Sequence, residues 1–219
     1  MVFQVAQDST LQPISIRSRY LRAKRTLDIV FVLLIAPIVL LVGIVIALWI
    51  KLDSPGPVFF RQKRVGQNGA EFTMLKFRSM YINGDESVHQ RRVEEMMRKG
   101  LTLSKMKDDP RITRVGRFIR KTSLDEVPQF WNVLCGQMTL VGPRPPLPYE
   151  VALYTERDWL RLSGRPGLTG TWQVYGRSEV TLTDMVEMDL AYLKEQSLRQ
   201  DLKLIFLTIP IMILGRGGA

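Results

Sequence analysis

The hydropathy pattern of the chain is dominated by an uncharged run of 22 residues from Ile29 to Ile50. About 20 apolar residues in a helix, each rising 1.5 Å, cross a hydrocarbon core of roughly 30 Å, so the run predicts a membrane segment. It exceeds the apolar region of about 7–15 residues in a signal peptide, and no small-x-small cleavage site follows it. The pattern therefore favours a membrane helix over a cleaved signal peptide.

The charges beside this run argue against a helix that crosses the bilayer. Residues 17–25 carry five basic residues and no acidic ones, and residues 51–64 carry four basic residues against one acidic residue. Positive flanks prefer the cytoplasm, and here both flanks are positive. Pro37 removes a backbone donor inside the run and kinks a helix, which leaves two arms too short to cross separately. We therefore expect residues 24–50 to form a re-entrant helix that enters and leaves on one face.

The remainder of the chain reads as one domain at residues 51–219, with a polar N-terminal segment at residues 1–23 ahead of the membrane helix. At the start of this domain, Pro57–Val65 and Glu71–Met80 are rich in Phe and Val, and they bracket an Asn-Gly pair within residues 66–69. Asn-Gly tolerates positive φ, so this segment predicts a small β-hairpin.

Helical spacing dominates the rest of the domain, so the predicted fold class is α+β with mostly helix. The expected helices are Asp85–Lys99, Pro110–Lys121, Leu147–Leu162 and Asp184–Glu195. Asp109 and Pro110 supply an N-cap and a first helical residue for the second of them. The apolar run Leu202–Leu214 is too short to span a bilayer and predicts an amphipathic interfacial helix. Trp159 and Trp172 could extend this docking surface, although core packing is the default for a single tryptophan.

The chain also carries a large excess of positive charge, because Lys and Arg exceed Asp and Glu by 31 − 21 = 10. Such a charge suits an anionic partner. The partner could be nucleic acid, a phospholipid surface or a phosphorylated small molecule, and charge alone does not choose among them. One cysteine, Cys135, excludes an internal disulfide and a Cys-rich zinc site, and the single His89 argues against a His-dependent triad or a multi-His metal cluster. Chemistry must therefore rest on carboxylates and cations.

Two adjacent carboxylates, Asp125 and Glu126, follow the basic end of a predicted helix. Ser123–Glu126 fits the S-x-x-E capping box, which would place both carboxylates at a helix N-terminus beside Arg120. Neighbouring side chains on a helix point about 100° apart, so the two acids would take separate tasks rather than share a proton. One could attack a substrate while the other holds a metal. A plain helix cap, with acids that stabilise the helix dipole, is the alternative.

Three further arginines occupy loops that proline or glycine stiffens. They are Arg144 within residues 141–146, Arg165 within residues 164–170, and Arg177 after Gly176. A planar guanidinium on a rigid loop reaches two phosphate oxygens at once at a small entropic cost. The three loops therefore predict recognition of several phosphate oxygens.

Taken in order, these motifs resemble those of the bacterial sugar transferases known as monotopic phosphoglycosyl transferases, from about Lys24 to the C-terminus. The segments that carry the resemblance are Lys24–Asp28, Leu75–Met80, Arg120–Gln129, Val141–Pro145, Arg165–Gly170, Gln173–Arg177 and Asp189–Tyr192, with Ser197 and Asp201. One departure is Ala36-Pro37, where the family often has Ser-Pro. The change removes a hydroxyl that could satisfy the carbonyl freed by the kink.

The resemblance implies an enzyme at the cytoplasmic face of the bacterial inner membrane, held there by a re-entrant helix and interfacial helices in contact with phospholipid. It implies transfer of a sugar-1-phosphate from a UDP-sugar to undecaprenyl phosphate, with release of UMP, as the first membrane step of exopolysaccharide or O-antigen assembly. Similarity around Gln173–Arg177 inclines toward a hexose such as galactose or glucose. On this interpretation residues 51–219 are a cytoplasmic catalytic domain.

The resemblance also implies roles for individual residues. Asp125 is expected to attack the phosphorus next to the sugar and carry a covalent phosphosugar, and Glu126 to bind Mg²⁺, with Asp125 as a further metal contact. The candidates for phosphate binding are Lys76, Arg78, Arg120, Arg144, Arg165 and Arg177. Asp189 and Tyr192, at i and i+3 of a helix, either recognise the uridine or sugar or form a local packing pair.

Two other functions could use the same positive surface. A non-catalytic, membrane-anchored scaffold would bind anionic lipid without needing Asp125 and Glu126, so neutralising this pair separates the two classes. A nucleic-acid reader is disfavoured, because the anchor would confine it and no basic-aromatic binding pattern is present. The sequence does not identify the sugar, and it leaves open whether the chain forms a homo-oligomer.

Overall fold

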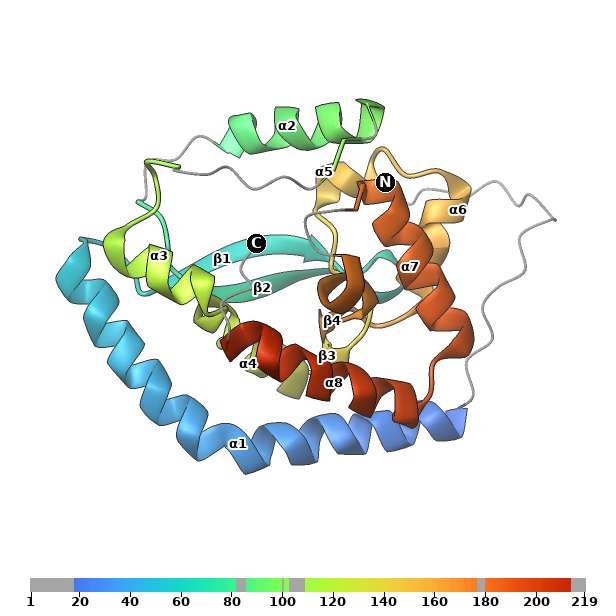
Figure 1. Cartoon of the computed structure of the whole chain (residues 1–219), viewed down its shortest axis with the longest axis horizontal. Coiled ribbons are helices and arrows are strands. Elements are labelled where there is room, and N and C mark those ends of the chain that lie inside the picture. The colour runs from blue at the N-terminus through green and yellow to red at the C-terminus, as the bar shows by residue number, and fades with distance from the viewer. Residues whose placement is uncertain (1–17, 82–85, 100, 103–108, 177–179, 214–219) are drawn as a thin grey trace.

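The computed structural model describes residues 18–81, 86–99, 101–102, 109–176 and 180–213. These residues form a mostly helical α+β fold with two small sheets, so the predicted fold class is confirmed. In Figure 1, a long helix borders the domain, and the other helices surround a central β-hairpin. The helix predicted over Asp85–Lys99 lies on the side of the domain away from this long helix (Figure 1).

The described residues form helices of 4 to 36 residues and two two-stranded sheets. The helices are α1 (Ser18–Asp53), α2 (Glu86–Lys99), α3 (Arg114–Lys121), α4 (Gln129–Leu134), α5 (Pro148–Val151), α6 (Glu156–Trp159), α7 (Leu182–Glu195) and α8 (Leu198–Ile213). The 3-10 turns are η1 (Gln67–Gly69), η2 (Leu124–Glu126) and η3 (Leu160–Ser163), and η4 (Trp172–Gly176) is a π-helical turn. The strands are β1 (Phe59–Val65), β2 (Glu71–Phe77), β3 (Thr139–Val141) and β4 (Gly167–Thr169). The helices predicted where α2, α7 and α8 lie are confirmed.

The single helix predicted over Leu147–Leu162 is wrong, because the chain is split there into α5, α6 and η3. The reason is a new N-cap in the middle of the segment. Thr155 accepts a hydrogen bond from Asp158 N (3.3 Å), and Asp158 Oδ2 accepts one from Thr155 N (2.9 Å). This reciprocal capping box starts a second helix where the apolar spacing alone predicts a continuous one.

Helix α3 also starts later than predicted. Thr113 caps it, with its Oγ1 accepting a hydrogen bond from Gly116 N at 2.9 Å. Asp109, the predicted N-cap, instead forms an ion pair with Arg111 at 2.7 Å. A capping side chain must lie within reach of the second or third helical N–H, and Thr113 satisfies this condition where Asp109 does not.

The β-hairpin is confirmed with its predicted turn. Strands β1 and β2 are antiparallel, with Phe59 opposite Phe77 and Lys76 opposite Phe60. In the turn, Asn68 has φ 55° and Gly69 has φ 81°, positive values that Asn and Gly adopt more easily than other residues. The turn therefore places Lys76 near the open end of the hairpin.

Helix α1 confirms the predicted long apolar helix, and it extends beyond residues 24–50 at both ends. It is long and apolar enough to cross a membrane by length and composition. Pro37 lies inside it, and the helix bends midway in Figure 1. The large apolar side chains of Leu34, Ile38 and Leu41 are between 66% and 76% exposed. A row of exposed side chains of this kind on one helix is typical of a surface that contacts lipid.

Both ends of α1 are held by the same domain. Near its start, Lys24 Nζ forms a buried ion pair with Asp201 Oδ2 of α8 at 2.7 Å. Near its end, Ile50 packs in one apolar cluster with Phe77 of β2 and Ile119 of α3. The bend therefore returns the helix to the domain that it leaves.

Strands β3 and β4 form a second, parallel sheet, and their backbones approach closely at two glycines. Gly142 N donates to Thr169 O at 2.9 Å, and Thr139 pairs with Gly167. A Cβ on Gly142 would lie 2.5 Å from Arg165 O, and one on Gly167 would lie 2.1 Å from Gly142 N. Only glycine fits at these positions, and the two Pro- and Gly-rich loops with predicted phosphate-binding arginines are thereby brought side by side.

Candidate active site

The two adjacent carboxylates lie in η2, a single 3-10 turn between α3 and α4. The capping box predicted for Ser123 is wrong, because Ser123 adopts a left-handed conformation (φ 56°) and its side chain makes no cap hydrogen bond. Pro128 then precedes the first residue of α4, where the missing N–H of a proline removes no helical hydrogen bond. The sharp turn at Ser123 thus presents Asp125 and Glu126 between two helices.

Asp125 is a buried carboxylate, with 9% of the residue exposed. Burial, together with the neighbouring charge of Glu126, raises the pKa of Asp125 to about 6 against the opposing charges of Lys76 and Arg120. Within the part of the chain that the structure describes, no ion pair holds this carboxylate. A desolvated carboxylate near two cations is a typical environment for a catalytic group.

Glu126 is tied to the hairpin. Lys76 Nζ of β2 donates to Glu126 Oε1 at 2.7 Å, and the two side chains are 23% and 35% exposed. Arg120 lies in the last turn of α3, directly before η2. The structure therefore brings together four of the predicted site residues, namely Asp125, Glu126, Lys76 and Arg120.

The site lies against the second half of α1. Leu124 and Val127, which flank the two acids in sequence, pack against the cluster that contains Ile46 and Ile50 of α1. Because these apolar neighbours surround η2, Asp125 is removed from water while its acidic partner Glu126 stays half-buried. The carboxylates are therefore positioned beside the long apolar helix.

Arg78 lies away from this group, at the C-terminal end of α1. Its guanidinium donates to Ser54 O (2.7 Å), Ser54 Oγ (2.9 Å) and Pro55 O (2.8 Å). These acceptors lie where the last carbonyls of a helix lack intrahelical partners, so Arg78 caps α1. Lys76 and Arg78 are only two residues apart in sequence, but they do not share one site, because β2 ends at Phe77.

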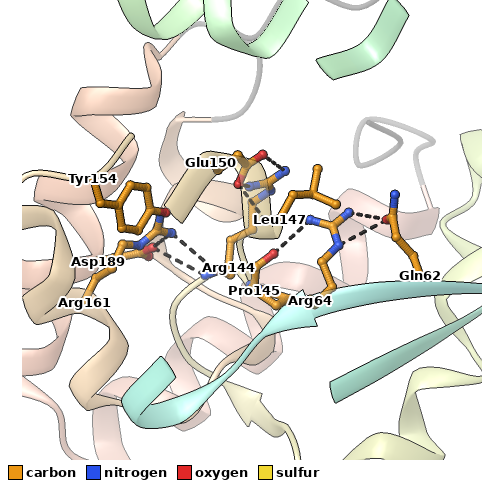
Figure 2. A network of polar contacts seen from close by, with 9 residues as sticks. All are labelled: Gln62, Arg64, Arg144, Pro145, Leu147, Glu150, Tyr154, Arg161 and Asp189. Carbon is orange, nitrogen blue, oxygen red and sulfur yellow. Dashed lines mark hydrogen bonds and ion pairs between the residues drawn. The ribbon is translucent and has the colours of Figure 1, made fainter. Parts of the chain in front are cut away.

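Arg144 is also held within the protein. Its guanidinium makes two parallel contacts with Glu150, at 2.8 Å and 3.1 Å, and Figure 2 shows the pair inside a larger buried network. Asp189 in this network binds Arg161, and it accepts a hydrogen bond from Arg144 N at 3.4 Å. Arg161 is 1% exposed, and its place in this buried network was not predicted from the sequence, where a lone arginine in a helical segment carries no distinguishing signal.

Tyr192 enters a different hydrogen-bond network from Asp189, so no polar contact pairs these two side chains. Tyr192 OH lies 2.5 Å from Asp201 Oδ1 and accepts a hydrogen bond from Lys24 Nζ at 3.1 Å. Both Asp189 and Tyr192 are at most 2% exposed. Asp189 holds the loop of Arg144 against α7, and Tyr192 holds the start of α1 against the same helix.

Of the last two predicted cations, Arg165 is described by the structure and lies near the charges of Arg25 and Asp28. Arg165 is half-buried near α1, where burial and the charge of Arg25 lower its pKa and the charge of Asp28 raises it. Arg177 lies outside the described residues. The structure thus supports Lys76 and Arg120 as neighbours of Asp125 and assigns Arg78 and Arg144 to internal contacts.

No group of three or more His, Cys, Asp or Glu that could hold a metal ion occurs among the described residues. Mg²⁺ does not need such a group, because it commonly binds one or two carboxylates together with substrate phosphates and water. Asp125 and Glu126 offer two adjacent carboxylates, so the residues present fit a magnesium ion bound with a phosphorylated substrate.

Comparisons with known proteins identify the family of the chain. The family model for bacterial sugar transferases matches residues 19–215. The chain is 44% identical over 200 residues to the galactosyl transferase CpsE of Streptococcus agalactiae, with 91% of this chain and 44% of that protein covered. It is 40% identical over 203 residues to the exopolysaccharide production protein ExoY of Sinorhizobium fredii, with 90% and 88% covered.

A third relative is the UDP-glucose:undecaprenyl-phosphate glucose-1-phosphate transferase of Escherichia coli, which is 43% identical over 194 residues, with 85% of this chain and 39% of that protein covered. The chain thus spans less than half the length of the streptococcal and E. coli relatives and most of the length of ExoY. With nearly every described residue inside the matched region, the chain belongs to the bacterial sugar transferase family.

Proposed function

We propose that this protein transfers a hexose-1-phosphate from a UDP-sugar to undecaprenyl phosphate and releases UMP, as the first membrane step of exopolysaccharide or O-antigen assembly. The observation that carries this proposal is the desolvated carboxylate of Asp125 beside Glu126, Lys76 and Arg120. The names of relatives in Salmonella typhimurium and Escherichia coli specify undecaprenyl phosphate with galactose and glucose, respectively, which supports a hexose substrate.

The reaction divides into two displacements at phosphorus. First, a carboxylate oxygen of Asp125 forms a bond to the phosphorus next to the sugar, and the bond from that phosphorus to the oxygen of UMP breaks. Next, an oxygen of undecaprenyl phosphate attacks the same phosphorus, which releases the Asp125 carboxylate and leaves a sugar joined to the lipid through a diphosphate. Burial favours the first step, because a poorly hydrated carboxylate attacks more readily than one surrounded by water.

Cations near Asp125 would offset the negative charge of the two phosphates. Lys76 and Arg120 lie closest to the carboxylates, and we keep Arg165 and Arg177 as proposed phosphate ligands from the neighbouring loops. Glu126, with Asp125, would hold Mg²⁺, which supplies charge neutralisation at the diphosphate when bound. The internal pairing of Arg78 and Arg144 favours structural roles for both.

Helix α1 and the exposed apolar side chains near it support placement at the membrane. Trp131 of α4 is 61% exposed and Phe206 of α8 is 69% exposed, whereas Trp159 and Trp172 pack against buried clusters. Trp49 of α1 contacts Phe118 of α3, with ring centroids 5.3 Å apart. We propose that α3, α4 and α8 rest on the cytoplasmic face of the inner membrane, with α1 re-entering the same face.

The transfer reaction is tested by UMP release. We expect the full chain in detergent or nanodiscs to release UMP from UDP-galactose or UDP-glucose when undecaprenyl phosphate and Mg²⁺ are present. UDP-N-acetylglucosamine and UDP-N-acetylgalactosamine should react more slowly by about 10-fold or more, because a pocket built around a hydroxyl rejects a bulkier acetamido group. Preferential use of an acetamido sugar would overturn the hexose assignment, and release from none of the four would overturn the transferase assignment.

The re-entrant topology is tested by thiol labelling. Single cysteines replace Ser18, at the start of α1, and Lys63, whose side chain is 77% exposed on β1, in a Cys135→Ser background. We expect a membrane-impermeant reagent to label neither site in intact cells and both sites after permeabilisation of the inner membrane. The reason is that both ends of α1 are bound to one domain. Labelling of one site alone in intact cells would establish a helix that crosses the bilayer.

A further inference from the structure

Strand β2 carries Lys76, and its edge away from β1 is bound by a side chain instead of another strand. Asn132 of α4 is 1% exposed. Its Oδ1 accepts a hydrogen bond from Leu75 N at 3.1 Å, and its Nδ2 donates to Thr73 O at 2.8 Å. One amide side chain therefore satisfies a donor and an acceptor of the strand, as the peptide group of a neighbouring strand would.

The orientation of this amide follows from its two partners on β2, and a third contact agrees with it. Asn132 Nδ2 also donates to Gln137 Oε1 at 2.7 Å, while the main-chain oxygen of Asn132 accepts from Gln137 N (3.0 Å) and Met138 N (3.2 Å). Leu75 N–H requires an acceptor and Thr73 O requires a donor, so only one orientation of the amide satisfies every partner. The Asn132 side chain is thus bound to β2 on one side and to Gln137 on the other.

The two segments that Asn132 joins each carry part of the candidate active site. Leu75 directly precedes Lys76 on β2, and α4 follows η2 after only Val127 and Pro128. Apolar packing between Met74 and Val133 also holds β2 near α4, but such packing has no directional requirement and tolerates sliding. Two hydrogen bonds to main-chain atoms of Thr73 and Leu75 set the register along the strand.

We propose that Asn132 is a positioning residue for the reaction, which holds β2 in register with α4 so that Lys76 stays beside Asp125 and Glu126. This inference rests on the proposed function. Asn132 is more than 50 residues from Thr73 and Leu75 in sequence, and it reaches neither carboxylate. It acts through the strand, by keeping Lys76 Nζ at its 2.7 Å contact with Glu126.

The first test replaces Asn132 with Leu, which removes both hydrogen bonds to β2 and adds no charge. We expect kcat for UMP release to fall about 10- to 100-fold, since a shift near 1 Å in a positioned group has effects of this order. KM for the UDP-sugar should change by less than about 3-fold, because a charge moved within the site affects the transition state more than initial binding. The matched control is Gln137→Ala, which removes only the third contact of the amide and should keep kcat within about 2-fold of wild type.

A double-mutant cycle with Lys76→Ala separates positioning from a general loss of structure. If Asn132 acts through Lys76, adding Asn132→Leu to Lys76→Ala should change the single-turnover rate of UMP release by less than about 2-fold. Thermal unfolding of all four proteins should show the same loss of stability from Asn132→Leu in both backgrounds. If the two rate effects multiply instead, Asn132 does not act through Lys76 and the proposal is wrong.

Two further outcomes are distinguishable. If Asn132→Leu does not fold, Asn132→Asp takes its place. Aspartate keeps the shape of the side chain and the acceptor for Leu75 N, but it directs an oxygen at Thr73 O and so loses that hydrogen bond. The double-mutant cycle with Lys76→Ala is then repeated with this variant. Absence of UMP release in wild type would remove the proposed function itself. A wild-type enzyme that is active, with an Asn132 variant that keeps full kcat, would remove this inference and leave the transferase assignment standing.

Discussion

Asp125→Asn is expected to abolish UMP release and covalent labelling while making the protein more resistant to unfolding. An amide is a poor nucleophile, so no bond to phosphorus should form. Intact-mass measurement after incubation with UDP-sugar alone should show a phosphosugar adduct on wild type and none on the variant. An adduct that persists on Asp125→Asn would remove Asp125 as the nucleophile, and normal turnover would remove its catalytic role altogether.

The expected gain in stability follows from the pKa of Asp125. Burial raises this pKa from 3.8 to about 6, so the folded state binds the proton more tightly than the unfolded chain. The free energy of unfolding therefore falls as the pH rises between these values, and the neutral amide avoids a cost of about 1–3 kcal/mol at pH 7.5.

Thermal unfolding without added metal checks this gain in stability. The matched control is Glu71→Gln, an exposed acid of the hairpin, which should change neither stability nor turnover. A loss of stability in Asp125→Asn would show that the carboxylate is a structural group.

Removal of metal is expected to stop UMP release without detaching the protein from membranes. A divalent cation held by Asp125 and Glu126 would offset phosphate charge that Lys76 and Arg120 alone would leave unbalanced, whereas docking of α1 and α8 depends on apolar contact. EDTA should therefore abolish turnover, added Mg²⁺ should restore it, and sedimentation with vesicles should be unchanged throughout. Full activity under thorough chelation would mean that the cationic side chains neutralise the diphosphate by themselves.

Glu126→Gln tests the metal assignment at the level of a residue. We expect turnover and adduct formation to fall by about 100-fold or more, with part of the activity recovered at higher Mg²⁺ concentration, because the amide keeps one weak oxygen ligand and loses the charge. Glu150→Gln is not a suitable control, since Glu150 is buried against Arg144. An unchanged dependence on Mg²⁺ in Glu126→Gln would remove Glu126 as a metal ligand.

The sequence by itself determined those features that depend on neighbours along the chain. The apolar run around Pro37 predicts a bent helix because hydrophobicity and the missing N–H of proline act locally. The Asn68-Gly69 turn predicts the hairpin for the same reason, since positive φ is a property of those two residues. The adjacent acids Asp125 and Glu126 stand out from their spacing alone, although the turn that presents them is a 3-10 turn after a left-handed Ser123 and has no capping box.

Only the tertiary structure decided which cations lie beside the two acids. Lys76, Arg78 and Arg144 look equivalent in a linear sequence, yet Lys76 meets Glu126, Arg78 caps α1, and Arg144 pairs with Glu150. A buried charge must find a partner, and the nearest partner in space is set by chain segments far apart in sequence. The same reason hides Asn132 and Arg161, since an amide or a guanidinium acquires its role only when folding brings its main-chain or carboxylate partners within about 3 Å.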